Sequence, residues 1–411
     1  MNVAIGTEQT SVGERAVWLD SSRHALITGK SGVGKSTLLF NIVVSHIRNG
    51  DGVLTVDPHG DLVDKILSHI PKSRIRDVIY IDPLAKRVPG LNIFDYAKAE
   101  DKERAVQSFL TMAKSISGDS WGPETERVLN AAADAIVKSY PNPTIIPIHL
   151  FLMRPRFRKK LLSESDDPLL ADFLSQYDEE LRASERMSKF SPAVNKTDKF
   201  LRPYIRTIVG QPDSIDFKEA MDTQKIILAR LPKGHLGSIT ASLIGSIIVS
   251  HMSISALQRK ANRTPFYVFI DEVHNFTHGI DLPTVLAEAR KYGITIFLAT
   301  QNLDQLPHPS AVFGNCSNLI SFRMGGRDSE IMAQELGNEF QSSSIVSLPD
   351  RTFCASLLED GNPNLYEQVS CLPPLKRDEN DSTFRDVIKV ARQRYGKNRK
   401  KTEQEVLKML S

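Results

Sequence analysis

A glycine-rich segment near the start of the chain, GKSGVGKST at residues 29–37, has the composition of a loop that binds phosphate. It fits the pattern G-x-x-x-x-G-K-[ST] completely, in which glycines let backbone N–H groups turn toward an anion at a helix N-terminus. Lys35 is expected to reach the β- and γ-phosphates of ATP, and the Ser36 hydroxyl to bind Mg²⁺. The predicted nucleotide-binding set is Gly29, Lys30, Ser31, Gly32, Val33, Gly34, Lys35, Ser36 and Thr37.

Hydrolysis of a bound nucleotide needs carboxylates, and the segment FYVFIDEVHNF at 266–276 supplies an adjacent pair. Asp271 is expected to hold Mg²⁺ through water, and Glu272 to orient and deprotonate the attacking water. One apolar run later, ITIFLAT is followed by Gln301, whose amide could sense the γ-phosphate. The sequence therefore predicts Glu272 and Gln301 as catalytic residues, and Ser36 and Asp271 as metal ligands.

Two short motifs superficially support a GTPase instead, D-x-x-G at 57–60 and N-K-x-D at 195–198. A guanine-reading Asn and Asp must follow a buried strand, whereas the segment KFSPAVNKTD is polar and contains Pro192. The second motif also falls within a segment of helical patterning. We therefore favour ATP over GTP.

A sheet must position these residues, and short apolar runs rich in β-branched residues supply its strands. Helical patterns lie between several of these runs, which favours a mainly parallel sheet. Residues 101–204 interrupt the alternation with successive amphipathic helices, which indicates an all-helical insert. The runs expected to be strands are 24–28, 53–57, 78–82, 225–231, 266–271, 294–300 and 319–324.

The expected fold class is therefore α/β, a P-loop NTPase core with a mainly parallel sheet plus an inserted all-α domain. Its expected limits are 1–100 for the first part of the core, 101–204 for the insert, 205–373 for the second part, and 374–411 for a charged helical tail.

Composition limits the setting in which the protein works. The net charge of +3 is too small to indicate nucleic acid unless the basic residues are clustered. The N-terminus lacks the basic start and apolar core of a signal peptide, and the apolar runs 145–153 and 243–252 are short for a bilayer span. The three well-separated cysteines match no metal or redox spacing. We expect a cytoplasmic protein without direct membrane insertion.

Two clusters of basic residues are candidates for ionic, sequence-independent contact with a DNA backbone. Runs of charge more often form solvated faces, and this alternative stays open for both clusters. One cluster lies in the insert and the other in the tail: Arg154, Arg156, Arg158, Lys159 and Lys160, and Arg392, Arg394, Lys397, Arg399, Lys400 and Lys401.

Seven motifs occur in a characteristic order along the chain, and no one of them would be specific alone. Together they resemble the conjugative coupling-protein branch of the HerA–FtsK superfamily of DNA-translocating ATPases, from about residue 5 to 395. The resemblance implies a RecA-like core, a helical insert and a hexameric ring with DNA in its central channel. The motifs are the phosphate loop, VDPHGDL (56–62), LPKGHLG (231–237), FIDEVHNF (269–276), AEARKYG (287–293), LATQNLDQL (298–306) and SFRMGGRD (321–328).

The same resemblance implies that Arg290 reaches the nucleotide of the neighbouring subunit and that Gln301 senses the γ-phosphate. Arg323 and Arg327 are weaker candidates for an inter-subunit contact, because a strand-end arginine that pairs with Asp328 explains them equally well.

Three further positions stay open. Asp57 and His59 could tune the site or contact a neighbouring subunit, but a turn built on Pro58 and Gly60 also explains them. His274 stands where a glutamine is expected. Membrane-bound coupling proteins carry N-terminal transmembrane helices, and this chain resembles their soluble relatives.

Two further classes of function remain beside the DNA motor. One is a motor for protein substrates, and the other is an ATP-dependent switch within a nuclease or defence complex. The intact Glu272 disfavours the switch, because a switch has less need of a catalytic acid. The strandedness of the DNA and the identity of a relaxase, nuclease or secretion-machine partner are left open.

Overall fold

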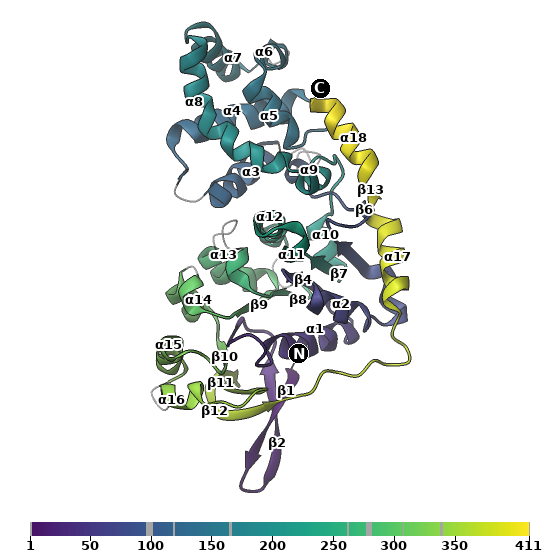
Figure 1. Ribbon diagram of the computed structural model, residues 1–411, viewed down its shortest axis with the longest axis vertical. Coiled ribbons are helices and arrows are strands. Elements are labelled where there is room, and N and C mark those ends of the chain that lie inside the picture. The colour runs from purple at the N-terminus through teal and green to yellow at the C-terminus, as the bar shows by residue number, and fades with distance from the viewer. Residues whose placement is uncertain are drawn as a thin grey trace. The chain divides into compact units, whose positions relative to one another are not determined.

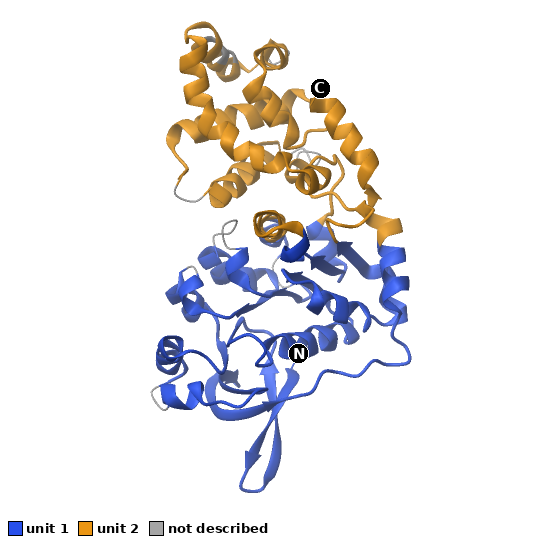
Figure 2. Cartoon of the chain, in the orientation of Figure 1, with its two compact units in different colours: residues 1–81, 217–235, 252–391 blue, residues 82–216, 236–251, 392–411 orange. Residues whose placement is uncertain are grey.

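The structure is a computed structural model that describes residues 2–95, 102–117, 120–163, 167–260, 263–276, 282–306, 308–337 and 340–410. The chain divides into two compact units (Figure 2). Unit 1 comprises 1–81, 217–235 and 252–391, and unit 2 comprises 82–216, 236–251 and 392–411. The domain limits expected from the sequence remain predictions.

Unit 1 is built on an 11-stranded sheet in the order β2-β1-β12-β11-β10-β3-β9-β8-β4-β7-β5 (Figure 1). From β10 to β5 all neighbouring strands are parallel, whereas β2, β1, β12 and β11 form an antiparallel extension. The strands are β1 (Asn2–Thr10), β2 (Gly13–Asp20), β3 (Ala25–Thr28), β4 (Gly52–Asp57), β5 (Val78–Ile81), β7 (Ile226–Arg230), β8 (Phe266–Ile270), β9 (Ile294–Thr300), β10 (Asn318–Phe322), β11 (Thr352–Glu359) and β12 (Asn362–Cys371).

The parallel part of the sheet contains all seven runs that the sequence predicts as strands, and the predicted α/β core is confirmed. Strands β3, β4, β5, β8, β9 and β10 are buried throughout, as expected for a sheet covered on both faces. Such strands need no alternation of polar and apolar residues, which is why they read as continuous apolar runs in the sequence.

Sequence analysis missed the antiparallel strands at the other end of the sheet. In β2 only Val17 and Leu19 are buried, and β12 buries only Tyr366 and Val369. These strands are polar over much of their length because they are largely exposed, so they lack the apolar signal of the parallel strands.

Helices connect the strands of unit 1 and pack on the sheet. Helix α1 contributes ten buried side chains, and its apolar residues join those of α2 and the sheet in one core. These elements are α1 (Lys35–Arg48), α2 (Asp61–Leu67), η1 (Lys72–Asp77), α10 (Phe217–Asp222), η6 (Val273–Asn275), α13 (Leu282–Glu288), η8 (Ala289–Tyr292), η9 (Leu303–Gln305), α14 (Pro309–Asn315), α15 (Gly326–Leu336) and α16 (Ser342–Val346).

Unit 2 is mainly helical, and a small two-stranded sheet joins β6 to β13. Helix α3 buries an apolar stripe at Val106, Phe109, Leu110 and Ala113. Pro155 begins a new helix, so residues 147–162 belong to two helices separated at Arg154. The elements are β6 (Arg87–Val88), α3 (Lys102–Ser117), α4 (Pro123–Ser139), α5 (Ile146–Met153), α6 (Pro155–Ser163), α7 (Pro168–Leu174), η4 (Ser175–Glu179), α8 (Ala183–Thr197), η5 (Asp198–Leu201), α9 (Pro203–Val209), β13 (Lys397–Asn398) and α18 (Arg399–Leu410).

Three helices contribute residues to both units: α11 (Lys233–Leu236), α12 (Ser238–Leu257) and α17 (Phe384–Tyr395). The apolar run 243–252, expected to be short for a bilayer span, lies within the 20 residues of α12. By length and composition α12 is long and apolar enough to cross a membrane, so that expectation was wrong. However, 78% of its apolar window is buried inside the protein, as in a core helix.

Candidate nucleotide-binding and hydrolysis site

The residues predicted for nucleotide chemistry follow the carboxyl ends of four neighbouring parallel strands. In the sheet order β3-β9-β8-β4, these strands are followed by Gly29, Gln301 and Asp271, and β4 itself ends at Asp57. Because parallel strands end at the same edge of the sheet, the four positions meet there. Three of them, Gln301, Asp271 and Asp57, line a cavity of about 420 Å³ there, together with Ser31, Gly32, Gly34, Lys35, Ser36, Thr37, His59, Asp61, Leu62, Lys65, Glu272 and Arg351.

The phosphate loop wraps over the end of β3 and leads into α1. Gly29 and Gly34 have φ angles of 145° and 128°, which L-residues with a Cβ rarely adopt. A Cβ on Gly29 would lie 2.6 Å from the Cβ of Phe322, so a side chain there would collide with β10. The Lys30 amide donates to the Arg323 carbonyl at 2.9 Å and anchors the loop to the next strand. Residue 29 must therefore be glycine, both because of its φ angle and because β10 leaves no room for a side chain.

Lys35 is buried at the centre of the loop, with only 5% of its surface exposed. Its Nζ donates to the carbonyls of Gly29 at 2.5 Å and Lys30 at 2.8 Å. Burial lowers the pKa of Lys35, and the carboxylates of Glu272 and Asp271 oppose that shift. The ammonium group therefore lies in the loop with its hydrogen bonds made to backbone oxygens, which a phosphate group can replace.

The acidic pair lies at the same edge, after β8. Asp271 donates its backbone N–H to Val56 at 3.1 Å, and its Oδ1 accepts the Glu272 N–H at 3.1 Å. Burial, followed by the nearby Asp57 and Glu272, raises the pKa of Asp271 to about 7. A carboxyl group held in this way favours a nearby cation, which would restore its charged form. Ser36 lines the same cavity, so the oxygen donors present suit Mg²⁺.

Glu272 adopts a left-handed conformation, with a φ angle of 51°. Its Oε1 accepts a hydrogen bond from Nε2 of Gln301. Its Oε2 lies 3.6 Å from Nδ1 of His274. Burial lowers the pKa of His274, and Glu272 opposes that shift. Gln301 therefore holds the predicted catalytic carboxylate directly, a contact that sequence analysis did not foresee.

Glu272 and Gln301 also border a second, adjoining cavity of about 490 Å³. Its lining includes His59, Lys233 and Asp328. This cavity extends the site on the side of the catalytic carboxylate.

Asp57 forms the turn that sequence analysis held open as an explanation, and it also belongs to the site. Its two carboxylate oxygens accept N–H groups of His59 at 2.8 Å and Val63 at 3.0 Å. It lines the cavity and contributes to the raised pKa of Asp271. Asp57 thus shapes the loop after β4 and sets the electrostatics around Asp271.

Arg290 lies at the opposite edge of the sheet from the cavity. It belongs to η8, which precedes β9, whereas the cavity residues follow the strands. Burial lowers the pKa of Arg290, and the nearby charge of Arg23 lowers it further, whereas Asp20 opposes the shift. Arg23 and Asp20 both precede β3. The structure thus does not bring Arg290 together with Lys35 and Glu272 of the same chain.

The buried ring of His24 contacts both β9 and α13 at this edge of the sheet. Its Nδ1 accepts the Ile296 N–H of β9 at 2.9 Å, and Nε2 lies 3.0 Å from the Leu286 carbonyl of α13. Because the first contact needs an unprotonated nitrogen, it fits the burial that lowers the pKa of His24 to about 4. His24 therefore fixes the two elements on either side of Arg290.

Arg323 and Arg327 have in-chain partners. Arg323 pairs with Asp350 at 2.6 Å, and not with Asp328, the partner that the sequence left open as an alternative. Arg327 lies 3.5 Å from Asp304 and is 80% exposed. Asp350 is distant in the sequence, but the pairing of β11 with β10 brings it beside Arg323.

The basic cluster of the insert contains one buried arginine and several exposed basic residues. Arg158 is 1% exposed, pairs with Asp178 at 2.5 Å and lies over the ring of Phe190. It stabilises the interior of unit 2 and is not available to DNA. Arg156, Lys159 and Lys160 are exposed. Within the tail cluster, Lys397 pairs with Asp213 at 2.5 Å, and Lys400 and Lys401 are exposed.

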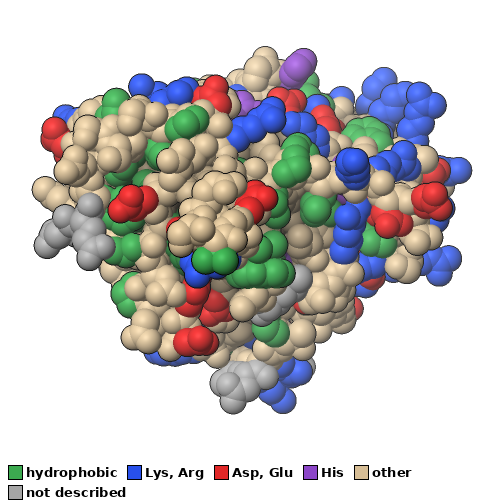
Figure 3. Space-filling view, turned by 90° about the horizontal axis from the view of Figure 1, so that it is seen from below, with side chains coloured by type: hydrophobic (Ala, Val, Ile, Leu, Met, Phe, Trp, Pro, Cys, Tyr) green, Lys and Arg blue, Asp and Glu red, His purple; other side chains and the backbone are tan. Residues whose placement is uncertain are grey.

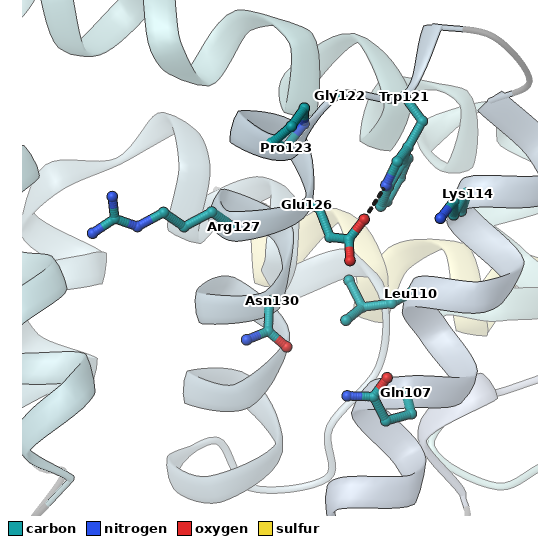
Figure 4. A pocket seen from close by; sticks show the side chains of 9 residues that line it. All are labelled: Gln107, Leu110, Lys114, Trp121, Gly122, Pro123, Glu126, Arg127 and Asn130. Carbon is teal, nitrogen blue, oxygen red and sulfur yellow. Dashed lines mark hydrogen bonds between the residues drawn. The ribbon is translucent and has the colours of Figure 1, made fainter.

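Another cavity, of about 650 Å³, lies within unit 2 between α3 and α4 (Figure 4). The indole of Trp121 points toward Glu126 and donates to it at 2.6 Å, while Arg127 points away (Figure 4). Its lining has neither a phosphate loop nor an acidic pair.

On the face of the molecule in Figure 3, acidic side chains lie among the basic ones, so this face is not uniformly basic.

Two family models match successive parts of the chain. The type IV secretion-system coupling protein DNA-binding domain matches residues 15–183, and the TraM recognition site of TraD and TraG matches residues 265–347. No curated protein matches the chain.

Solved structures share the fold at low identity. The unbound bacterial conjugative coupling protein TrwBdeltaN70 has 17% identity and a TM-score of 0.64, over 88% of this chain and 87% of that chain. TrwB with the ATP analogue ADPNP has 18% identity and a TM-score of 0.63, over 88% of each chain. VirB4 of Thermoanaerobacter pseudethanolicus has 13% identity and a TM-score of 0.58, over 89% of this chain and 95% of that chain. The core is thus the RecA-like fold of these proteins, with its helical domain. The two family models and this shared fold together support a conjugative coupling protein-like P-loop ATPase.

Proposed function

We propose that this protein binds Mg²⁺ and ATP in the cavity of unit 1 and hydrolyses ATP to move DNA. The observation that carries the proposal is the convergence of Lys35, Ser36, Asp271, Glu272 and Gln301 on one cavity. TrwB structures in complex with ADPNP, and with ADP and Mg²⁺, support the choice of nucleotide and metal.

In this mechanism Lys35 exchanges its bonds to Gly29 and Lys30 for the β- and γ-phosphates. Ser36 and Asp271 would hold Mg²⁺, which would neutralise charge on the phosphates. Glu272 takes a proton from the attacking water, and Gln301 orients the Glu272 carboxylate by its hydrogen bond. Gln301 can also respond to the γ-phosphate, because it lines the same cavity.

Arg290 completes the site from a neighbouring subunit in a homo-oligomeric ring, which we expect to be hexameric. Its place at the far edge of the sheet supports this role, since no movement of one side chain carries it to its own cavity. There its guanidinium would stabilise charge that develops on the transferred phosphoryl group.

DNA is the proposed substrate, held by non-specific ionic contacts. The match to a coupling-protein DNA-binding domain supports this substrate, and the exposed Arg156, Lys159 and Lys160 lie within the matched residues. Such contacts weaken steeply with salt. A relaxase, nuclease or secretion machine is the kind of partner that would supply the DNA.

The test is ATP turnover by a sized oligomer with and without single- or double-stranded DNA, across a salt series. We expect DNA to stimulate turnover and the stimulation to fade as salt increases. Turnover that DNA does not alter, but that a polypeptide substrate raises, would replace the DNA motor with a protein motor. Absence of any turnover, with ATP still bound, would favour the nucleotide switch.

A further inference from the structure

Arg351 is placed against the phosphate loop by its own backbone, just before β11. Its N–H donates to the Val33 carbonyl at 2.8 Å, and its carbonyl accepts the Cys371 N–H at 2.8 Å. Its Cα lies 3.4 Å from the point where a Cβ on Gly34 would stand. The loop that grips phosphate and the residue before β11 are thus one packed structure.

The segment before Arg351 is also held. Arg323 bonds Asp350 at 2.6 Å through Nη2 and the Leu348 carbonyl at 3.3 Å through Nη1. The arginine at the end of β10 therefore supports the turn that presents Arg351.

Arg351 adopts a left-handed conformation, with a φ angle of 62°. A glycine would occupy this conformation more easily, so an arginine is retained here at a conformational cost. Of the described non-glycine residues with positive φ, Glu272 and Arg351 are the two that line the nucleotide cavity. Strained residues of this kind gather at functional sites.

The Arg351 side chain is exposed, and it makes no ion pair with the residues that the structure describes. Arg351 lines the nucleotide cavity together with Gly34 and Thr37, but it does not line the adjoining cavity that Glu272 and Gln301 also border. Its hydrogen bond to Val33 places it beside the phosphate loop, whose backbone N–H groups are expected to hold the α- and β-phosphates.

We propose that Arg351 binds the α-phosphate of the nucleotide held by Lys35 of the same chain. A guanidinium presents a fork of N–H donors that suits phosphate oxygens, and here no described carboxylate neutralises it. This inference rests on the proposed function. Because ADP and ATP share the α-phosphate, Arg351 contributes to the binding of both.

The test measures dissociation constants of ADP and ADPNP for the full chain and for Arg351→Gly. Glycine accepts a φ of 62° without strain, so the variant should keep its melting temperature. We expect both nucleotides to bind about 10- to 100-fold more weakly, by similar factors. Arg351→Lys should recover part of the loss, because an ammonium still binds phosphate.

Arg385→Ala, which removes an exposed arginine on α17 that lines neither cavity, is the matched control and should bind both nucleotides normally. A loss for ADPNP alone overturns the assignment, because it places Arg351 at the γ-phosphate. A loss that Arg351→Lys does not recover also overturns it, in favour of stacking on the base. Unchanged binding in Arg351→Gly while Lys35→Ala loses binding rejects this inference alone, whereas unchanged binding in both rejects the nucleotide site.

Discussion

Glu272 and Arg290 lie at opposite edges of one parallel sheet, on neighbouring strands. Glu272 follows the carboxyl end of β8, and Arg290 precedes the amino end of β9, with Ile270 paired to Leu298 and Phe266 to Ile294. A strand of five residues spans about 17 Å, at about 3.3 Å per residue. A nucleotide bound beside Glu272 is therefore out of reach of Arg290 of the same chain, and the role proposed for Arg290 requires a second chain.

Lys35→Ala should abolish nucleotide binding and turnover. Lys35 is the cation that the loop directs at the β- and γ-phosphates, and its removal leaves that charge uncompensated. Titration with ADPNP checks this, with Lys260→Ala, which removes an exposed lysine outside the site, as the control. If the variant bound ADPNP with an affinity within about twofold of the parent, the assignment of this loop as the phosphate-binding loop would be wrong.

Glu272→Gln should keep ATP and DNA binding but lose turnover by about 10²- to 10⁴-fold, the range typical of general acid–base groups. The amide is nearly isosteric, yet it cannot take the proton of the attacking water. Steady-state ATPase rates and nucleotide titrations on the same preparation separate the two effects. Near-normal hydrolysis would show that another group activates the water.

Gln301→Ala should bind ATP normally and turn it over more slowly, by about 10- to 100-fold. Its amide holds Oε1 of Glu272, and without it the carboxylate loses its orientation. The double variant with Glu272→Gln should be no slower than Glu272→Gln alone, because Gln301 acts through Glu272. Additive losses in the double variant would instead show an independent role, such as direct contact with the γ-phosphate.

Asp271→Asn should stabilise the nucleotide-free protein at alkaline pH. Asp271 titrates at about 7 in the folded protein and near 4 when unfolded, so the folded state holds the proton more tightly. The stability that this group contributes is present below pH 4 and is lost as pH rises to about 7.

The variant avoids that loss, so it should exceed the parent by about 2–4 kcal/mol at pH 8, and the gap should close near pH 4. Urea unfolding at both pH values measures the gap, with Glu330→Gln, an exposed site on α15, as the control. If the variant and the parent differed in unfolding free energy by the same amount at both pH values, burial would not raise the pKa of Asp271.

The parallel strands, the phosphate loop and the acidic pair could be predicted because each is written in a few consecutive residues. The antiparallel strands β2 and β12 could not, since they are exposed on much of their surface and carry little apolar signal. Arg351 was missed for a different reason. It lies more than 300 residues after Val33, and only the pairing of β11 with β10, beside β3, brings it to the loop.

The separation of Glu272 and Arg290 makes the central claim directly testable with two inactive proteins. Arg290→Ala should bind ATP normally but lose turnover, because arginines used across an interface contribute about 10³- to 10⁵-fold in rate. Glu272→Gln should be inactive through the other half of the proposed composite site. In a mixed ring, some interfaces join an intact Arg290 to an intact Glu272.

The decisive measurement is the ATPase rate against the mixing ratio of these two variants, after co-assembly and with mixed oligomers verified by native mass spectrometry. Each variant mixed with unaltered protein serves as the control for subunit exchange. We predict that activity returns and peaks near equal proportions. A flat baseline across all ratios, in mixed oligomers whose parent subunits remain active beside either variant, would contradict hydrolysis at a site shared between two chains.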